Sequence, residues 1–194
     1  MAWKHWEFWP ARLFEAPYYA YLAWRCLVCR LPPRFIAKAN YALDHGEIGI
    51  GSKFATQMAF AQDRFPATDL LPADLSPIDK RARATAFGEA HGWPLILKPD
   101  HGAVGKGLIK VDSPDMLETS LNLLVGDYIV QAYVDLKNEY GVFFVRLRGH
   151  GTVTGINQKH FPAVTGDGHQ TLDALARAHY RYTPHWHLFL QYLD

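Results

Sequence analysis

The sequence has only two cysteines, no block of like charge and no internal repeat, and these absences exclude several classes of protein. Its 20 basic and 19 acidic residues give a formal net charge of +1, so no basic surplus indicates a nucleic-acid partner. Cys26 and Cys29 form a lone Cys-x-x-Cys, without the further ligands of a zinc site or the βαβ context of a thioredoxin-like site. We interpret them as buried structural thiols of a reducing compartment.

A clean apolar run long enough to cross a membrane is also missing, although the first 30 residues come close. Nine aromatic residues lie within the first 24 positions: Trp3, Trp6, Phe8, Trp9, Phe14, Tyr18, Tyr19, Tyr21 and Trp24. Arg12, Glu15 and Arg25 would each cost about 2.5–3.5 kcal/mol at the centre of a membrane helix, which outweighs this apolar gain. Two interpretations of residues 3–30 remain. They form one or two helices packed on the protein body or on a missing part of the protein, or they form an interfacial segment with aromatic rings at the lipid headgroups and arginines facing anionic lipid.

No Walker A motif and no dinucleotide fingerprint is present, yet residues 93–111 have the features of a phosphate-binding hairpin. The apolar run 95–97 ends on Lys98, and a glycine-rich loop at 102–107 leads into the apolar run 108–111. Glycines let successive backbone N–H groups converge on phosphate oxygens, and Lys98 adds a positive charge at the strand end. On these residues alone, a plain surface hairpin is equally consistent with the pattern.

Strand and helix signals run through the rest of the chain. Apolar runs indicate strands at 95–97, 108–111, 127–134, 139–146 and 152–159, with a tight turn at His150–Gly151. Capping residues indicate helices from Ser52 to Gln62, from Ser76 to Gly92, from Ser113 to about Val125, and from Thr171 onward. The sequence therefore predicts an α+β fold of two small antiparallel sheets, each with helices on one face.

The order of these motifs resembles that of ATP-grasp enzymes, in the group of D-alanine–D-alanine ligases and cyanophycin-synthetase-like carboxylate–amine ligases. The pieces in family order are Leu-Lys-Pro at 97–99, the glycine loop, Ile-Val-Gln-Ala-Tyr-Val at 129–134, Glu139, and Val-Thr-Gly-Asp-Gly at 164–168. The resemblance covers roughly residues 50–180. It implies an aromatic-rich N-terminal segment at 1–50, a central ATP-grasp lobe at 51–134 and an incomplete second lobe at 135–194.

The resemblance implies an ATP site built from both lobes. Lys53 and Lys98 match the two nucleotide lysines of the family, and Gly102, Ala103, Val104, Gly105, Lys106 and Gly107 match its phosphate loop. Gln131, Ala132, Tyr133 and Val134 match the segment that reads adenine, and Glu139 matches the carboxylate that binds the ribose hydroxyls. Lys159 matches a basic residue facing the phosphates or the acyl-phosphate, and it is the candidate catalytic residue. Because a helix N-terminus is already partly positive, Lys53 beside Ser52 independently favours an anionic partner.

The family's chemistry also implies Mg²⁺, held by an acidic residue on one late strand and a Glu-x-Asn on the next. After Lys159 the acidic residues are Asp167, Asp173 and Asp194, and no Glu-x-Asn follows. We therefore predict no metal ligand in these 194 residues and expect a fragment or a naturally truncated chain, with the magnesium ligands in a missing C-terminal part. Asp167, between two glycines, is expected to form a turn. His179, His185 and His187 lack a carboxylate partner at ligand spacing, so we interpret them as exposed helix-end histidines.

The resemblance implies an ATP-dependent carboxylate–amine or carboxylate–thiol ligase, in which ATP phosphorylates a carboxylate and the second substrate attacks the acyl-phosphate. Its partners would be ATP, an unidentified carboxylate and an amine, in the cytoplasm or peripherally at a membrane. Two alternatives from other classes remain. One is a nucleotide-binding module without catalysis, and the other is a membrane-peripheral assembly subunit that contacts lipid through residues 3–30.

Overall fold

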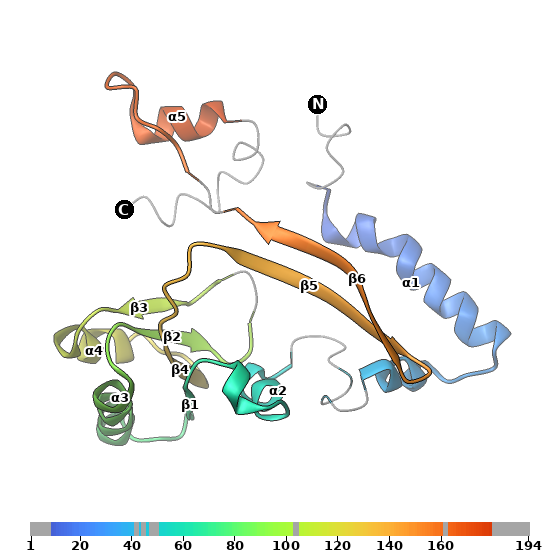
Figure 1. The fold of residues 1–194 in the computed structure, drawn as a ribbon, viewed down its shortest axis with the longest axis horizontal. Coiled ribbons are helices and arrows are strands. Elements are labelled where there is room, and N and C mark those ends of the chain that lie inside the picture. The colour runs from blue at the N-terminus through green and yellow to red at the C-terminus, as the bar shows by residue number, and fades with distance from the viewer. Residues whose placement is uncertain are drawn as a thin grey trace. The chain divides into compact units, whose positions relative to one another are not determined.

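The computed structural model describes residues 9–40, 43, 46, 51–102, 105–160 and 163–179. The chain divides into two compact units, residues 21–135 and residues 1–20 with 136–194. In chain order the elements are α1 (Ala11–Val28), the 3-10 segment η3 (Pro33–Asn40), α2 (Lys53–Met58), the 3-10 turn η5 (Gln62–Arg64), β1 (Thr68–Leu71), α3 (Pro77–His91), β2 (Leu95–Pro99), β3 (Ile109–Val111), α4 (Pro114–Leu121), β4 (Tyr128–Ala132), β5 (Glu139–Leu147), β6 (His150–Lys159) and α5 (Leu172–Ala178) (Figure 1).

Unit 21–135 is built on a four-stranded antiparallel sheet in the order β1-β4-β2-β3. Successive side chains of a strand point to opposite faces, so the sheet has two different surfaces. One surface packs against α3 and α4 and forms the core (Figure 1). The buried core residues are Leu71, Ala84, Phe87, Leu95, Leu97, Val111, Leu117, Tyr128 and Val130.

The opposite surface of this sheet carries polar side chains. Lys98 lies next to Leu97 along β2, and Gln131 next to Val130 along β4, so both point away from α3 and α4. Thr68 is the direct partner of Gln131 across β1 and β4. The period of two thus places an apolar core on one side of the sheet and three polar groups on the other.

Helix α3 begins and ends where its capping residues predict. The Ser76 hydroxyl accepts from the Asp79 N–H at 3.1 Å, Pro77 occupies the first turn, and Gly92 ends the helix with a φ of +83°. The Arg83 guanidinium binds both carboxylate oxygens of Asp69 at 2.6 Å, which ties α3 to β1. This pair lowers the pKa of Asp69, first through the hydrogen bond from Arg83.

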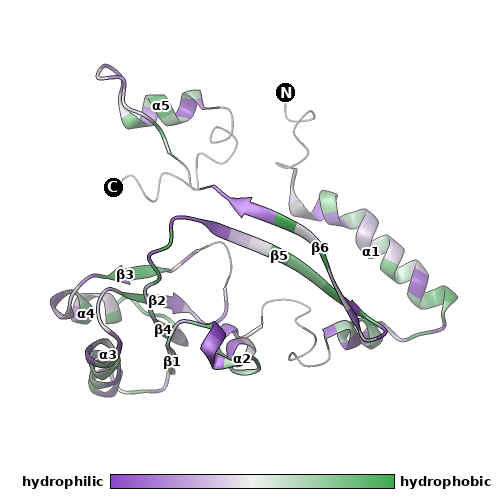
Figure 2. Ribbon diagram, in the orientation of Figure 1, coloured by the Kyte–Doolittle hydropathy of each residue, from purple (hydrophilic) through white to green (hydrophobic). Residues whose placement is uncertain are grey.

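Strands β5 and β6 form a separate antiparallel hairpin in which Glu139 pairs with Lys159. The turn lies at Arg148–Gly149, not at His150–Gly151 as predicted, and both turn residues have positive φ. That is the geometry of a two-residue hairpin turn whose twist suits the flanking strands. Nearly every residue of the hairpin is exposed, including the apolar stretch of β5 visible in Figure 2.

Three helix and strand predictions need correction. α2 ends at Met58 rather than Gln62, and α4 ends at Leu121 rather than Val125. Strand β1 was not predicted, because its four residues, within the five that separate Pro66 from Pro72, are too few for a recognisable strand pattern. Its strand conformation depends on pairing with β4, which lies some 60 positions further along the chain.

Helix α1 carries five of the nine N-terminal aromatic side chains, whereas Trp3, Trp6 and Phe8 lie outside the described residues. Tyr18, Tyr19, Tyr21 and Trp24 are all more than half exposed in the structure. Cys26 is partly exposed and Cys29 exposed, both as free thiols, so the interpretation of two buried thiols was wrong. Across the described residues, no helix combines the length and the hydropathy needed to span a bilayer.

Candidate functional site

A pocket of about 430 Å³ lies in unit 21–135, on the sheet surface opposite α3 and α4. Its walls come from α2, from the segment that connects α2 to β1, and from β2 and β4. The lining residues are Lys53, Thr56, Gln57, Phe60, Phe65, Pro66, Lys98 and Gln131. Three of the residues singled out from the sequence, Lys53, Lys98 and Gln131, therefore lie around one cavity.

Lys98 is the half-buried cation of this pocket. Its Nζ donates to the side-chain oxygen of Gln131 at 2.9 Å, a diagonal contact between β2 and β4. Burial lowers the pKa of the Lys98 ammonium below its ordinary value, and the positive charge of Lys53 lowers it further. Two ammonium groups in one cavity make the site attractive to an anion.

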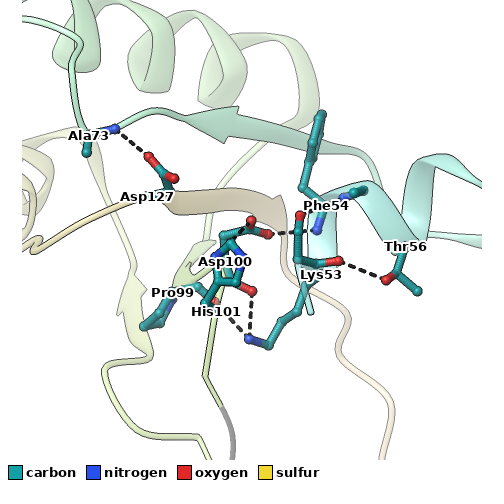
Figure 3. A network of polar contacts seen from close by, with 10 residues as sticks. Lys53, Phe54, Thr56, Ala73, Pro99, Asp100, His101 and Asp127 are labelled. Atoms are coloured by element: carbon teal, nitrogen blue, oxygen red, sulfur yellow. Dashed lines mark hydrogen bonds and ion pairs between the residues drawn. The ribbon is translucent and has the colours of Figure 1, made fainter. Parts of the chain in front are cut away.

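Lys53 begins α2, and its ammonium lies against the end of β2 (Figure 3). Nζ donates to the backbone oxygens of Pro99 and Asp100, each at 3.0 Å. The Asp100 carboxylate, 4% exposed, accepts from the Phe54 N–H at 2.8 Å. Asp100 therefore supplies a negative charge at the N-terminus of α2. The position of Lys53 at that N-terminus consequently no longer indicates an external anion.

Gln131 belongs to a polar network beneath the pocket. Its amide N–H₂ donates to the Thr68 hydroxyl at 2.7 Å and to the Gln57 side-chain oxygen at 3.3 Å. The Gln57 amide donates to the same hydroxyl at 2.8 Å and to the Pro66 oxygen at 3.2 Å. Gln57 is 7% exposed, so this network fastens α2 to the sheet from inside the unit.

The glycine loop leaves β2 beside this pocket. Gly102, Gly105, Lys106 and Gly107 are described, whereas Ala103 and Val104 lie outside the described residues. Gly107 has a φ of +76°, and a Cβ there would come within 2.9 Å of the Pro99 ring and 3.1 Å of the Tyr128 hydroxyl oxygen. Only glycine fits this position, where the loop returns across the end of β2.

The segment 132–134 begins at the last residue of β4 and continues beyond the strand. The Ala132 N–H donates to the backbone oxygen of Ala67 at 3.0 Å, and the Tyr133 N–H donates to that of Pro94 at 3.3 Å. Tyr133 and Val134 are substantially exposed, and Lys110 lies 4.9 Å from the Tyr133 ring centre. Their predicted role in reading a base remains a prediction.

Glu139 and Lys159 bind each other in the β5–β6 hairpin. Both carboxylate oxygens of Glu139 lie 3.0 Å from Lys159 Nζ, and both side chains are more than half exposed. They belong to the other compact unit, so their approach to the pocket of Lys98 remains a prediction.

Asp167 and Asp173, the last acidic residues that the structure describes, have partners within the fold. No group of three or more His, Cys, Asp or Glu side chains at metal-binding distance occurs in the described part of the chain. Asp167 forms the expected turn, since its carboxylate accepts from the backbone N–H groups of His169 and Gln170 at 2.9 and 2.8 Å. Asp173 pairs with Arg177 at 2.8 Å. His185 and His187 lie outside the described residues.

Sequence reasoning missed several residues of the site. Gln57, Thr68 and Asp100 are placed by contacts with distant parts of the chain, and Phe60 and Phe65 line the pocket from a non-repetitive segment. No local signal marked Asp100, because its contact with Phe54 spans 46 residues and the N-cap of α2 itself is Ser52.

Comparisons with known proteins give a partial match. A 48-residue stretch is 40% identical to a D-alanine–D-alanine ligase of Streptomyces griseus, covering 25% of this chain and 12% of that ligase. No protein-family model matches the chain. The resemblance to ATP-grasp ligases is therefore confirmed over part of the chain.

Solved structures resemble the chain in part as well. A carboxyaminoimidazole ribonucleotide synthase from Aspergillus clavatus, complexed with ATP, has a TM-score of 0.46 and 21% identity over 57% of this chain and 29% of its own. A D-alanine–D-alanine ligase from Helicobacter pylori has a TM-score of 0.41 and 16% identity over 62% and 38%. The D-alanyl-alanine synthetase A of Vibrio cholerae has a TM-score of 0.46 and 13% identity over 72% and 46%. The chain thus spans less than half the length of each of these relatives.

Proposed function

We propose that unit 21–135 binds the adenine nucleotide of an ATP-dependent carboxylate–amine or carboxylate–thiol ligase that acts through an acyl-phosphate. The observation that carries the proposal is the convergence of Lys53, Lys98 and Gln131 on one pocket of about 430 Å³. The short match to a D-alanine–D-alanine ligase supports the choice of nucleotide. In this proposal residues 51–134 act as the central ATP-grasp lobe and residues 135–194 as part of the second.

The chemistry of the pocket suits a purine nucleotide. Two ammonium groups supply positive charge for phosphate oxygens, and Phe60 and Phe65 supply apolar ring surface for a base. Their ring centres lie 6.1 Å apart. Lys159 would add charge near the transferred phosphoryl group, and Glu139 would accept from the ribose hydroxyls.

Calorimetric titration of the chain with ATP tests the proposal. We expect weak binding, and Lys98→Ala should remove a charge-assisted contact worth about 1.5–3 kcal/mol, which lowers affinity roughly 10- to 150-fold. Lys80→Ala is the matched control, since it removes the same charge from a partly exposed position outside the pocket, where the ammonium donates to the backbone oxygen of Ala73. Equal ATP affinities for wild type, Lys98→Ala and Lys80→Ala would contradict the assignment.

A nucleotide-binding module without catalysis is a second candidate, and the lack of a metal-binding cluster among the described residues favours it. Magnesium-dependent phosphate release separates the two candidates. Turnover by the purified chain that disappears in Lys98→Ala would favour the ligase, whereas nucleotide binding without turnover would favour the module.

Contact of residues 3–30 with a membrane surface is a further proposal, which the exposed aromatic side chains of α1 favour. The chain should then sediment with vesicles that contain anionic phospholipid. A double variant, Arg12→Gln with Arg25→Gln, should lose about 1 kcal/mol of binding per charge. Sedimentation that is the same with neutral and anionic vesicles would contradict this proposal.

A further inference from the structure

The single hydroxyl of Thr68 is hydrogen-bonded to three polar groups beneath the pocket, namely the backbone oxygen of Pro66 and the side-chain amides of Gln57 and Gln131. Its oxygen lies 2.8 Å from the backbone oxygen of Pro66, which can only accept, so the hydroxyl hydrogen is directed there. The lone pairs of Thr68 are then left for the side-chain amides of Gln57 and Gln131, at 2.8 and 2.7 Å. Thr68 therefore acts as an acceptor towards both amides and turns each N–H₂ towards itself.

Lys98 fixes the same amide of Gln131 from the other side. A charged ammonium has donors and no acceptor, so the atom 2.9 Å from Lys98 Nζ is the amide oxygen. The two constraints are independent and agree. When a ligand draws the Lys98 ammonium away, the bond to Thr68 is the constraint that still prevents the Gln131 amide from turning over.

The consequence is a fixed hydrogen-bonding polarity at the pocket wall. A carbonyl oxygen has two lone pairs, and Lys98 uses one, so the Gln131 oxygen retains the capacity for one further donor. A purine with an amino group at position 6 offers that donor. A purine with an oxygen there would bring two acceptors together, which a site built from fixed hydrogen bonds rejects.

We propose that Thr68, supported by Gln57, is a positioning residue that locks the Gln131 amide and makes the pocket selective for 6-aminopurine over 6-oxopurine nucleotides. This inference rests on the proposed nucleotide site. The carboxylate of a glutamate would accept in either orientation, whereas the glutamine of this chain needs the lock to behave as an acceptor.

The test is the ratio of the dissociation constants of inosine triphosphate and ATP, measured by calorimetry on the full 194-residue chain. We expect the wild type to prefer ATP by about tenfold or more, since one hydrogen bond is replaced by a repulsion. Thr68→Val should bring the ratio towards one, because the amide can then turn. Thr119→Val, at an exposed position of α4 outside the pocket, should keep the wild-type ratio.

A second pair of variants separates positioning from a general structural role. Gln131→Glu should prefer ATP whether or not Thr68→Val is added, because a carboxylate has no N–H₂ to hold. If melting curves show that Thr68→Val does not fold, Thr68→Ala replaces it, since it removes the same hydroxyl from the Gln131 amide. A reduced ratio in Thr68→Ala would then support the inference.

The outcomes distinguish the proposed nucleotide site from its proposed selectivity. A wild type that binds neither nucleotide would overturn the proposed function. A wild type that binds both equally well would overturn the selectivity inference alone. A folded Thr68→Val, or Thr68→Ala in its place, that keeps the wild-type ratio would do the same.

Discussion

Replacing Gly107 by alanine should destabilise unit 21–135 more than the same change at Gly105, two positions earlier in the loop. Both glycines have left-handed backbones, with φ of +76° and +71°. An alanine in that conformation costs about 1–2 kcal/mol at either site. Part of this cost is offset at both sites, because alanine also restricts the unfolded chain.

The surroundings of the two positions differ. A Cβ at Gly107 would lie 2.9 Å from Pro99 Cγ and 3.1 Å from the Tyr128 hydroxyl oxygen, whereas a Cβ at Gly105 would meet nothing within 4 Å. The proline ring is tied to β2 and cannot rotate away, so the clash should add about 1–3 kcal/mol, as overpacking does elsewhere. Gly107→Ala should therefore cost that much more than Gly105→Ala.

Hydrogen exchange of the backbone amides in β2 and β4 is the appropriate assay, because the slowest amides report the free energy of unfolding of their own unit. The unit as a whole should have a stability of about 5–15 kcal/mol, so the expected difference is well within reach. Equal losses in the two variants would refute the reasoning. They would show that the loop lifts off Pro99 without cost and that Gly107 is not needed for its path.

Two further predictions concern pH. Burial and the charge of Lys53 lower the pKa of Lys98, so as pH rises the folded unit releases this proton before the unfolded chain does. The free energy of unfolding of the wild type, relative to that of Lys98→Met, should therefore rise with pH between the lowered pKa and 10.5. Parallel curves of unfolding free energy against pH for the two proteins would contradict this prediction. Because the hydrogen bond from Arg83 lowers the pKa of Asp69, this carboxylate stabilises the fold above pH 3.8 and loses that effect as pH falls through the lowered pKa. Asp69→Asn should cost about 1 kcal/mol at neutral pH in urea unfolding and nothing in strong acid, and a cost independent of pH would argue against the pair.

Local signals predicted those parts of the fold whose determinants lie close together in sequence. The bounds of α3 follow from Ser76, Pro77 and Gly92, which the structure uses as caps. The hairpin turn was misplaced because Arg148–Gly149 and His150–Gly151 both end in glycine. The choice between them depends on the pairing of Glu139 with Lys159 and on a bulge after Phe143, and neither can be read locally.

In the candidate site, too, motifs in the sequence identified some residues, whereas others depend on long-range contacts. Motif order pointed to Lys53, Lys98 and Gln131, and they share a pocket. Thr68 and Gln57 were missed because a threonine and a glutamine have no distinctive pattern of their own. Their importance comes from hydrogen bonds to Gln131 across 63 and 74 residues of sequence, which exist only once β1 and β4 have paired.

The two pocket lysines keep the capacity to bind an anion although both already have partners. Two of the three N–H donors of Lys53 are directed at the oxygens of Pro99 and Asp100, and one donor of Lys98 at Gln131. All three acceptors are neutral, so neither positive charge is neutralised by these contacts. The Asp100 carboxylate is directed instead to the backbone of Phe54, where it stabilises the start of α2. The buried Asp100 carboxylate thus stabilises the start of α2, and both ammonium charges remain available in the proposed nucleotide site, as phosphate binding would require.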